Sequence, residues 1–174
     1  MSNGSFAPIA RKNNIKPNIF RWIKIKSDPK RELGINSKYK FRSSSDIISK
    51  TFEALAGIPK AIVHFYNSTS TLQRKVVFNS DKDGVKEIAT NGAHLIKQLS
   101  EKAKDTEWLF EYSAESFTGT ELEYAAEVCD EVVDILKEST SEKVIINLPA
   151  TVEMSTANIY GDQIEWMNEN LKNR

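Results

Sequence analysis

From about residue 46 onward, hydrophobic positions alternate between helical spacing and short continuous runs. Residues 46–56 carry apolar side chains at helical spacing, with Ser45 or Asp46 suited to cap the start and Gly57 suited to end the helix. The same spacing predicts further helices at 80–105, 120–138 and 155–172, the last with Ile159, Ile164 and Met167 pointing inward. β-branched or aromatic runs predict strands at 60–68, 107–116 and 143–150. The predicted order alternates helix and strand throughout.

This alternation predicts an α/β fold made of repeated βα units. Parallel strands need such crossovers, so the sheet is expected to be parallel. A doubly wound sheet and part of a (β/α)8 barrel both fit. No G-x-G-x-x-G follows a strand and no G-x-x-x-x-G-K-[ST] occurs, which counts against a dinucleotide site and a P-loop.

Side chains alternate between the two faces of a strand, and this parity favours the barrel. One face is apolar throughout; it carries Val63, Phe65, Phe110, Tyr112, Val144, Ile146 and Leu148. The other face starts apolar and becomes polar towards the strand ends; it carries Ile62, His64, Leu109, Glu111, Ser113, Glu115, Ile145 and Asn147. A barrel lumen changes in the same way, because it is packed below and opens into a site at the C-terminal mouth.

Each polar residue also has a structural interpretation, which stays open at this point. His64 can be a hydrogen-bonded core histidine and Glu111 an internal carboxylate with a buried partner. Ser113 can simply be small, and Asn147 can fix a loop. Cys129 lies on the apolar stripe of 120–138 and is interpreted as packing, and His94 as a surface or packing residue.

Composition is that of a soluble globular protein, but the charge is uneven. Residues 1–45 hold 11 Lys and Arg against 2 Asp and Glu, a balance of +9, and residues 46–174 carry −9. We expect residues 1–45 to be a basic, poorly ordered leader and 46–174 to be the folded domain. The acidic body argues against nucleic acid as the main partner, and no apolar run is long enough to span a bilayer. The single cysteine fits a reducing compartment.

Three long stretches carry a resemblance to a known family. These are "FEALAGIPKAIVHFYNSTSTLQRKVVF", "WLFEYSAESFTGTELEYAAEVCD" and "INLPATVEMSTANIYGDQIEWM". They resemble α-isopropylmalate synthase, most closely its long fungal and actinobacterial form, from about residue 46 to the end. The resemblance implies a TIM barrel, of which this chain would supply about strands four to six. It also implies an acyltransferase that condenses acetyl-CoA with 3-methyl-2-oxobutanoate in leucine biosynthesis, using a divalent metal such as Mg, Mn or Zn.

The same resemblance implies substrate-binding roles for five residues. His64 in "VHFYNSTS" matches a keto-acid contact, and Ser113 and Glu115 in "EYSAES" match pocket residues, with Ala114 where the family often has proline. Asn147 and Thr151 in "NLPATVE" match the remaining contacts. A keto acid offers carboxylate and ketone oxygens, which suit donors of these types.

Two family features do not occur in this sequence. There is no Arg-Asp pair of the D-x-R-D-G type and no H-x-H pair; the two histidines, His64 and His94, fall on different elements. No complete catalytic set and no metal ligands are therefore expected in this chain. We expect a fragment of such an enzyme, inactive alone; the alternative is a non-catalytic half-barrel that binds another molecule.

An open half-barrel is also expected to self-associate, as a homo-oligomer, because its edge strands lack partners. A cytoplasmic location is expected, with a mitochondrial or plastid location as the alternative if residues 1–45 act as a transit peptide. Sequence alone leaves open whether the chain is a truncated or mis-assembled gene product and whether it folds by itself.

Overall fold

The computed structural model of the protein describes residues 22–24, 37–140 and 143–174, with side chains from Ser45 onward. Its strands are β1 (Trp22–Lys24), β2 (Lys60–Ser68), β3 (Glu107–Glu115) and β4 (Ile145–Asn147). The longer helices are α2 (Ser37–Ala54), α4 (Lys82–Lys102), α5 (Leu122–Leu136) and α6 (Ala157–Asn170). Short turns are α3 (Thr71–Gln73), the π-helix η2 (Arg74–Phe78), and the 3-10 helices η3 (Phe117–Gly119) and η4 (Lys137–Ser139).

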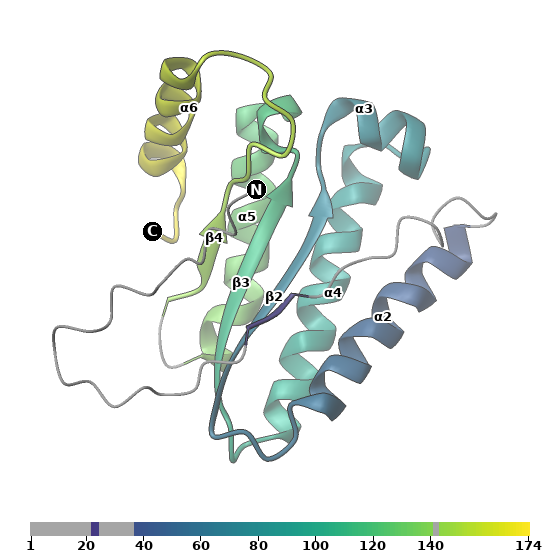
Figure 1. Ribbon diagram of the computed structural model, residues 1–174. Helices are drawn as coiled ribbons and strands as arrows, with labels where there is room; N and C mark the ends of the chain where they lie inside the picture. The colour runs from purple at the N-terminus through teal and green to yellow at the C-terminus, as the bar shows by residue number, and fades with distance from the viewer. Residues whose placement is uncertain (1–21, 25–36, 141–142) are drawn as a thin grey trace, which may run out of the picture.

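The strands form one parallel sheet in the order β1-β2-β3-β4, which confirms the predicted parallel βα units. Their C-terminal ends point the same way, towards the top of Figure 1. The register pairs His64 with Glu111 and Ser113 with Asn147. Polar positions of neighbouring strands are thereby brought to one level near the strand ends.

The helices cover one face of the sheet. Helices α4 and α5 pack side by side against β2 and β3, and α2 packs on α4 (Figure 1). Val63, Phe65, Phe110 and Tyr112 are buried in this core, so the predicted apolar face is confirmed. Cys129 is fully buried there, and burial raises the pKa of its thiol to about 12, as expected for a packing residue.

A second, smaller core joins α6 to α5. It contains Phe117 and Met167, both buried, with Tyr160 and Ile164 packed against it. The buried carboxylate of Asp130 on α5 accepts the backbone N–H of Lys172 at 3.0 Å and that of Asn173 at 3.4 Å. The residues that follow α6 are therefore tied back to α5.

Several element boundaries differ from those predicted. Helix α2 starts at Ser37 rather than near Asp46, since neither glycine nor proline interrupts residues 37–56. Strand β4 has three residues because Pro149 cannot donate to a ladder and β4 pairs with β3 alone among the described strands. Gly57 ends the helical segment as predicted, with φ of +81°.

Helix α6 confirms one prediction and corrects another. Met167 is buried as predicted, but Ile159, predicted to point inward, is 41% exposed. The buried stripe runs through Tyr160, Ile164 and Met167, so Ile159 falls one position outside it.

The predicted basic, poorly ordered leader, residues 1–45, falls mainly outside the described residues. Within it the structure describes β1 and the beginning of α2. Among the described helices, none combines the length and apolar character needed to cross a bilayer.

Candidate functional site

The candidate site lies at the C-terminal ends of β2, β3 and β4, on the sheet face opposite the helices. His64, Ser113 and Asn147 come from three adjacent strands and their side chains meet. Alternation along each strand puts all three on this face, as the parity predicted. Such a position at the strand ends is where parallel α/β sheets bind ligands.

Ser113 is the centre of this group and is only 3% exposed. Its Oγ accepts a hydrogen bond from Asn147 Nδ2 at 2.8 Å and lies 2.7 Å from His64 Nε2. If Nε2 carries the proton, the hydroxyl accepts two N–H groups and its own proton points to a third partner. If Nε2 is unprotonated, the hydroxyl donates to it. The imidazole tautomer thus sets whether Ser113 offers a proton to a ligand.

His64 also approaches Glu111, its pair in the strand register. Its Nε2 lies 3.6 Å from Glu111 Oε1, and both side chains are largely buried. Glu111 therefore has the nearby partner expected for an internal carboxylate. The structural and ligand-binding interpretations of His64 are compatible here.

Glu115 ends β3 and is fixed through both side chain and backbone. Ser68 donates its hydroxyl proton to Glu115 Oε2 at 2.9 Å, and Thr69 N–H donates to the Glu115 carbonyl at 3.0 Å. These bonds join the ends of β2 and β3. The carboxylate is half-buried and keeps acceptor capacity beyond the single bond from Ser68.

Thr151 lies outside the strands, in the connection from β4 to α6, and is exposed. Its Oγ1 accepts the backbone N–H of Ser116 at 3.0 Å. The structure thus brings His64, Ser113 and Asn147 into direct contact, whereas Glu115 and Thr151 are each held separately by residues of the neighbouring strand ends.

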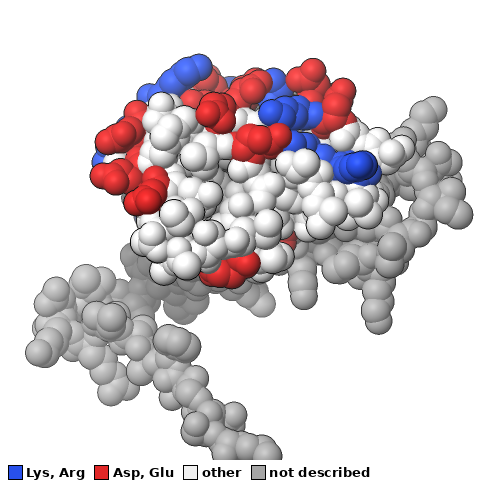
Figure 2. All heavy atoms as spheres, turned by 90° about the horizontal axis from the view of Figure 1, so that it is seen from above, with Lys and Arg blue, Asp and Glu red and all other residues white. Residues whose placement is uncertain are grey.

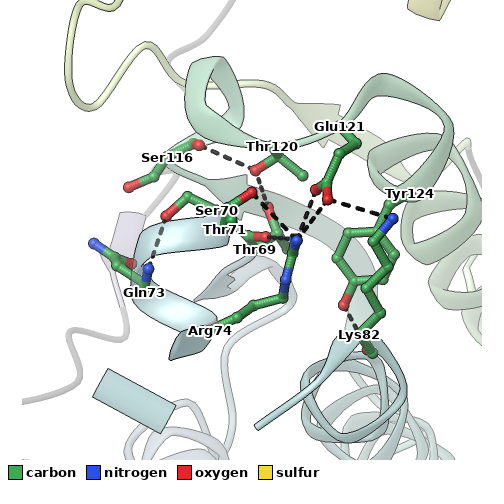
Figure 3. A network of polar contacts seen from close by, with 10 residues as sticks. All are labelled: Thr69, Ser70, Thr71, Gln73, Arg74, Lys82, Ser116, Thr120, Glu121 and Tyr124. Atoms are coloured by element: carbon green, nitrogen blue, oxygen red, sulfur yellow. Dashed lines mark hydrogen bonds and ion pairs between the residues drawn. The ribbon is translucent and has the colours of Figure 1, made fainter. Parts of the chain in front are cut away.

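An ionic network around the buried Arg74, beside the candidate site, was not predicted. Arg74 donates from Nη1 to the Thr69 carbonyl at 2.6 Å and from Nη2 to both carboxylate oxygens of Glu121, at 2.7 and 2.8 Å (Figure 3). Its guanidinium also lies 4.9 Å from the ring centre of Tyr124. Partial burial alone would raise the pKa of Glu121, but the hydrogen bonds and charge of Arg74 lower it to about 2.

The only sequence signal for this network was the capping pattern Ser70-x-x-Gln73. Ser70 Oγ accepts the backbone N–H of Gln73 at 3.3 Å and starts the turn that carries Arg74. The turn continues as a π-helix and ends at Asn79, whose φ is +47°. A π-helical turn has no hydrophobic periodicity that would reveal it in a sequence.

The surface above the strand ends carries little charge. Viewed from above, acidic and basic side chains gather along one side of the molecule, and the middle of this face is mostly uncharged (Figure 2). Exposed apolar side chains stand in the two connections at this end; they are Leu72, Val76, Val152 and Met154. The surroundings therefore suit a small ligand with an apolar part, whose oxygens meet the hydroxyl, amide and imidazole groups.

Comparison with known proteins identifies the family. The profile of the HMGL-like family matches residues 32–174. The chain belongs to the HMGL-like family. This family has the TIM-barrel fold, so the parallel sheet described above is part of a barrel, as predicted.

The chain is also similar to curated 2-isopropylmalate synthases. It is 57% identical to that of Mycobacterium ulcerans over 129 residues, which are 74% of this chain and 23% of the relative. It is 58% identical to that of Clostridium acetobutylicum over 130 residues, 74% of this chain and 23% of that relative. It is 54% identical over 133 residues to that of Paraburkholderia xenovorans, with 76% and 23% covered. The chain thus spans about a quarter of the length of these relatives, and the resemblance seen in its motifs is confirmed.

The family generally depends on a divalent metal. His64 and Glu111 are two ligand-type side chains that face the site. Within residues 45–140 and 143–174, however, no His, Cys, Asp or Glu group of three or more is placed to hold a metal ion. Two ligands do not make a closed or catalytic metal site. The residues described here therefore do not fit a metal by themselves.

Proposed function

We propose that this chain contributes the keto-acid pocket of a 2-isopropylmalate synthase, which condenses acetyl-CoA with 3-methyl-2-oxobutanoate in leucine biosynthesis. The observation that carries the proposal is the Ser113 hydroxyl, held between His64 and Asn147 from three adjacent parallel strands. The names of the bacterial relatives and their identity of 54–58% support it.

The pocket residues fit the chemistry of a keto acid. A hydroxyl proton from Ser113 and one from Thr151 match oxygens of the carboxylate and the ketone, while Asn147 fixes the Ser113 hydroxyl. Carbon–carbon bond formation at the ketone turns its oxygen into an alkoxide. A donor already aimed at that oxygen stabilises the developing charge without reorganisation.

We further propose that the metal ligands of this reaction lie outside these residues. The sequence contains neither the D-x-R-D-G pattern nor an H-x-H pair. The 174 residues given acetyl-CoA, 3-methyl-2-oxobutanoate and Mg²⁺ or Mn²⁺ should therefore release no CoA above background in a thiol assay. The reported relatives are bacterial, so we propose a cytoplasmic location, and those relatives offer no support for an organelle.

A binding experiment tests the pocket directly. Titration of the 174-residue chain with 3-methyl-2-oxobutanoate, followed by NMR, should shift resonances around Ser113 and Asn147. Asn147→Ala, Glu115→Ala and Thr151→Ala should each weaken binding roughly tenfold, since each removes a polar partner. The matched ligand control is 3-methylbutanoate, which lacks the ketone and should bind more weakly.

Val63→Ala is the matched protein control, because Val63 faces the helices and is fully buried. It should lower stability and leave keto-acid affinity unchanged. The proposed function would be contradicted if all three pocket variants bound the keto acid as tightly as the unaltered chain. It would also be contradicted if the unaltered chain did not bind the keto acid.

A further inference from the structure

The loop that carries Thr151 is exposed but not loose. It leaves β4 at Leu148 and reaches α6 at Ala157, and Thr151, Val152 and Met154 are all exposed. An exposed connection of this length is normally among the more mobile parts of a fold. The Thr151 hydroxyl can therefore bind a ligand in one orientation only if other residues fix this loop.

Three hydrogen bonds fix this loop. Tyr160 donates its hydroxyl proton to the Leu148 carbonyl at 2.6 Å. The backbone N–H of Ser116 donates to Thr151 Oγ1 at 3.0 Å, and Thr118 Oγ1 donates to the Val152 carbonyl at 2.6 Å. The last two bonds are accepted by the consecutive residues Thr151 and Val152, and both donors lie in the short connection from β3 to α5.

The residue between these two donors is fully buried. Thr118 lies in η3, next to Phe117, which is fully buried in the second core. The ring of Phe117 also meets that of Tyr160 edge-on, with centres 6.4 Å apart. Tyr160, and Phe117 between the two donors, thus pack in the same small core.

Ser116 adopts an unfavourable conformation at this place. Its φ of +56° and ψ of +40° are left-handed, although it is not a glycine. Its own hydroxyl is buried and has no hydrogen-bond partner among the described residues. Backbone strain and an unsatisfied polar group in one residue point to a functional reason for its conformation. This conformation directs the backbone N–H of Ser116 to Thr151 Oγ1.

The direction of this bond decides what Thr151 can do. A backbone N–H can only donate, so Thr151 Oγ1 is the acceptor and its own proton stays available. We propose that Thr118 is a positioning residue for Thr151: with the Ser116 N–H it holds the loop so that the Thr151 hydroxyl donates its proton to an oxygen of the bound keto acid. This inference rests on the proposed function.

The test uses the 174-residue chain with Thr118→Val, which removes the donor and keeps the side-chain shape, and with Thr118→Ser, which keeps the donor. Thr90→Val is the matched control, because Thr90 Oγ1 also donates to backbone carbonyls, those of Lys86 and Glu87, but within α4. Amide hydrogen exchange of Ser116 and titration with 3-methyl-2-oxobutanoate are measured on each variant.

Thr118→Val should speed exchange of the Ser116 amide roughly tenfold and weaken keto-acid binding by a similar factor, the effect of one lost hydrogen bond. Thr118→Ser should restore both, and Thr90→Val should change neither. An unchanged exchange rate of the Ser116 amide in Thr118→Val would show that Thr118 does not hold the loop. Faster exchange with unchanged affinity would show that Thr118 only stabilises the fold and would overturn the positioning role. If the unaltered chain did not bind the keto acid, the proposed function would be overturned, and so would the ligand part of this inference. The exchange rate of the Ser116 amide would still show whether Thr118 holds the loop.

Discussion

Arg74 shows how a buried charge is accommodated beside the candidate site. Its guanidinium is satisfied by the Thr69 carbonyl, by the Thr71 hydroxyl and by both oxygens of Glu121. Thr69 in turn donates to the Glu115 carbonyl, so the network reaches the backbone of a proposed pocket residue. A lysine could not reproduce the paired bonds to the carboxylate.

Acid should weaken this network through Glu121. The pKa of its carboxyl lies near 2 in the folded chain and near 4.5 in the unfolded one, so its contribution to stability is complete above pH 4.5 and is lost as the pH falls towards 2. Because the side chain is 40% exposed, solvent screening reduces the effect to about 1 kcal/mol. Urea unfolding at pH 7 and pH 3 should show a smaller acid loss for Glu121→Gln than for the unaltered chain.

The control for this measurement is Glu123→Gln, which changes an exposed carboxyl two residues further along the chain. Glu123→Gln should lose as much free energy of unfolding between pH 7 and pH 3 as the unaltered chain does. The same pH dependence in Glu121→Gln and the unaltered chain would show that the pair with Arg74 does not stabilise the fold.

At this scale, sequence reasoning predicted which residues face the site but not how they meet. Alternation along β2, β3 and β4 is a local property, so the common face of His64, Ser113 and Asn147 followed from it. Their hydrogen bonds depend on strand register, which pairs Ser113 with Tyr66 and makes His64 reach diagonally. Arg74 was missed because its burial results from Glu121, which lies 47 residues away.

At the level of elements, helix starts were the least predictable feature. A serine or aspartate caps a helix only where the residues before it are not helical. Residues 37–45 are already helical in α2, so Ser45 and Asp46 do not form a cap. Helix α4, by contrast, starts where a cap is formed. Asp81 accepts the backbone N–H of Gly84 at 2.9 Å and has extended backbone angles.

Removing the α4 cap should therefore have a measurable cost. Asp81→Ala should lower the free energy of unfolding by about 1 kcal/mol, and Asp81→Asn should recover most of it. Asp83→Ala, in the first turn of the same helix, removes a highly exposed charge whose distance to Lys86 is 3.9 Å, and should cost only a few tenths of a kcal/mol. Urea unfolding measures all three, and equal losses for the two alanine variants would contradict the role of Asp81.

At the scale of the molecule, the sheet has two outer strands. Among the described strands, β1 pairs only with β2, and β4 pairs only with β3. Ile145 on β4 is 39% exposed, as expected for an open lumen face. Ile62 and Leu109, which lie on the same face of the two central strands and pair in the register, are buried.

We therefore predict self-association through the β4 edge. Sedimentation of the 174-residue chain should show a dimer or larger species, because edge pairing satisfies open backbone groups and covers Ile145. Ile145→Lys should shift the equilibrium towards the monomer. Ile159→Lys, a similarly exposed position on α6, should have no such effect. A compact monomer that binds no hydrophobic dye would refute this prediction.

The carboxylate of Asp130 has a consequence for the motion of the last residues. By accepting the amides of Lys172 and Asn173, it sets the direction in which the backbone leaves α6. Irregular segments without such a tie can reorient on the nanosecond timescale. These amides should instead relax with the rotational tumbling of the whole body, so that a spin label or fluorophore attached beside them reports how large that body is.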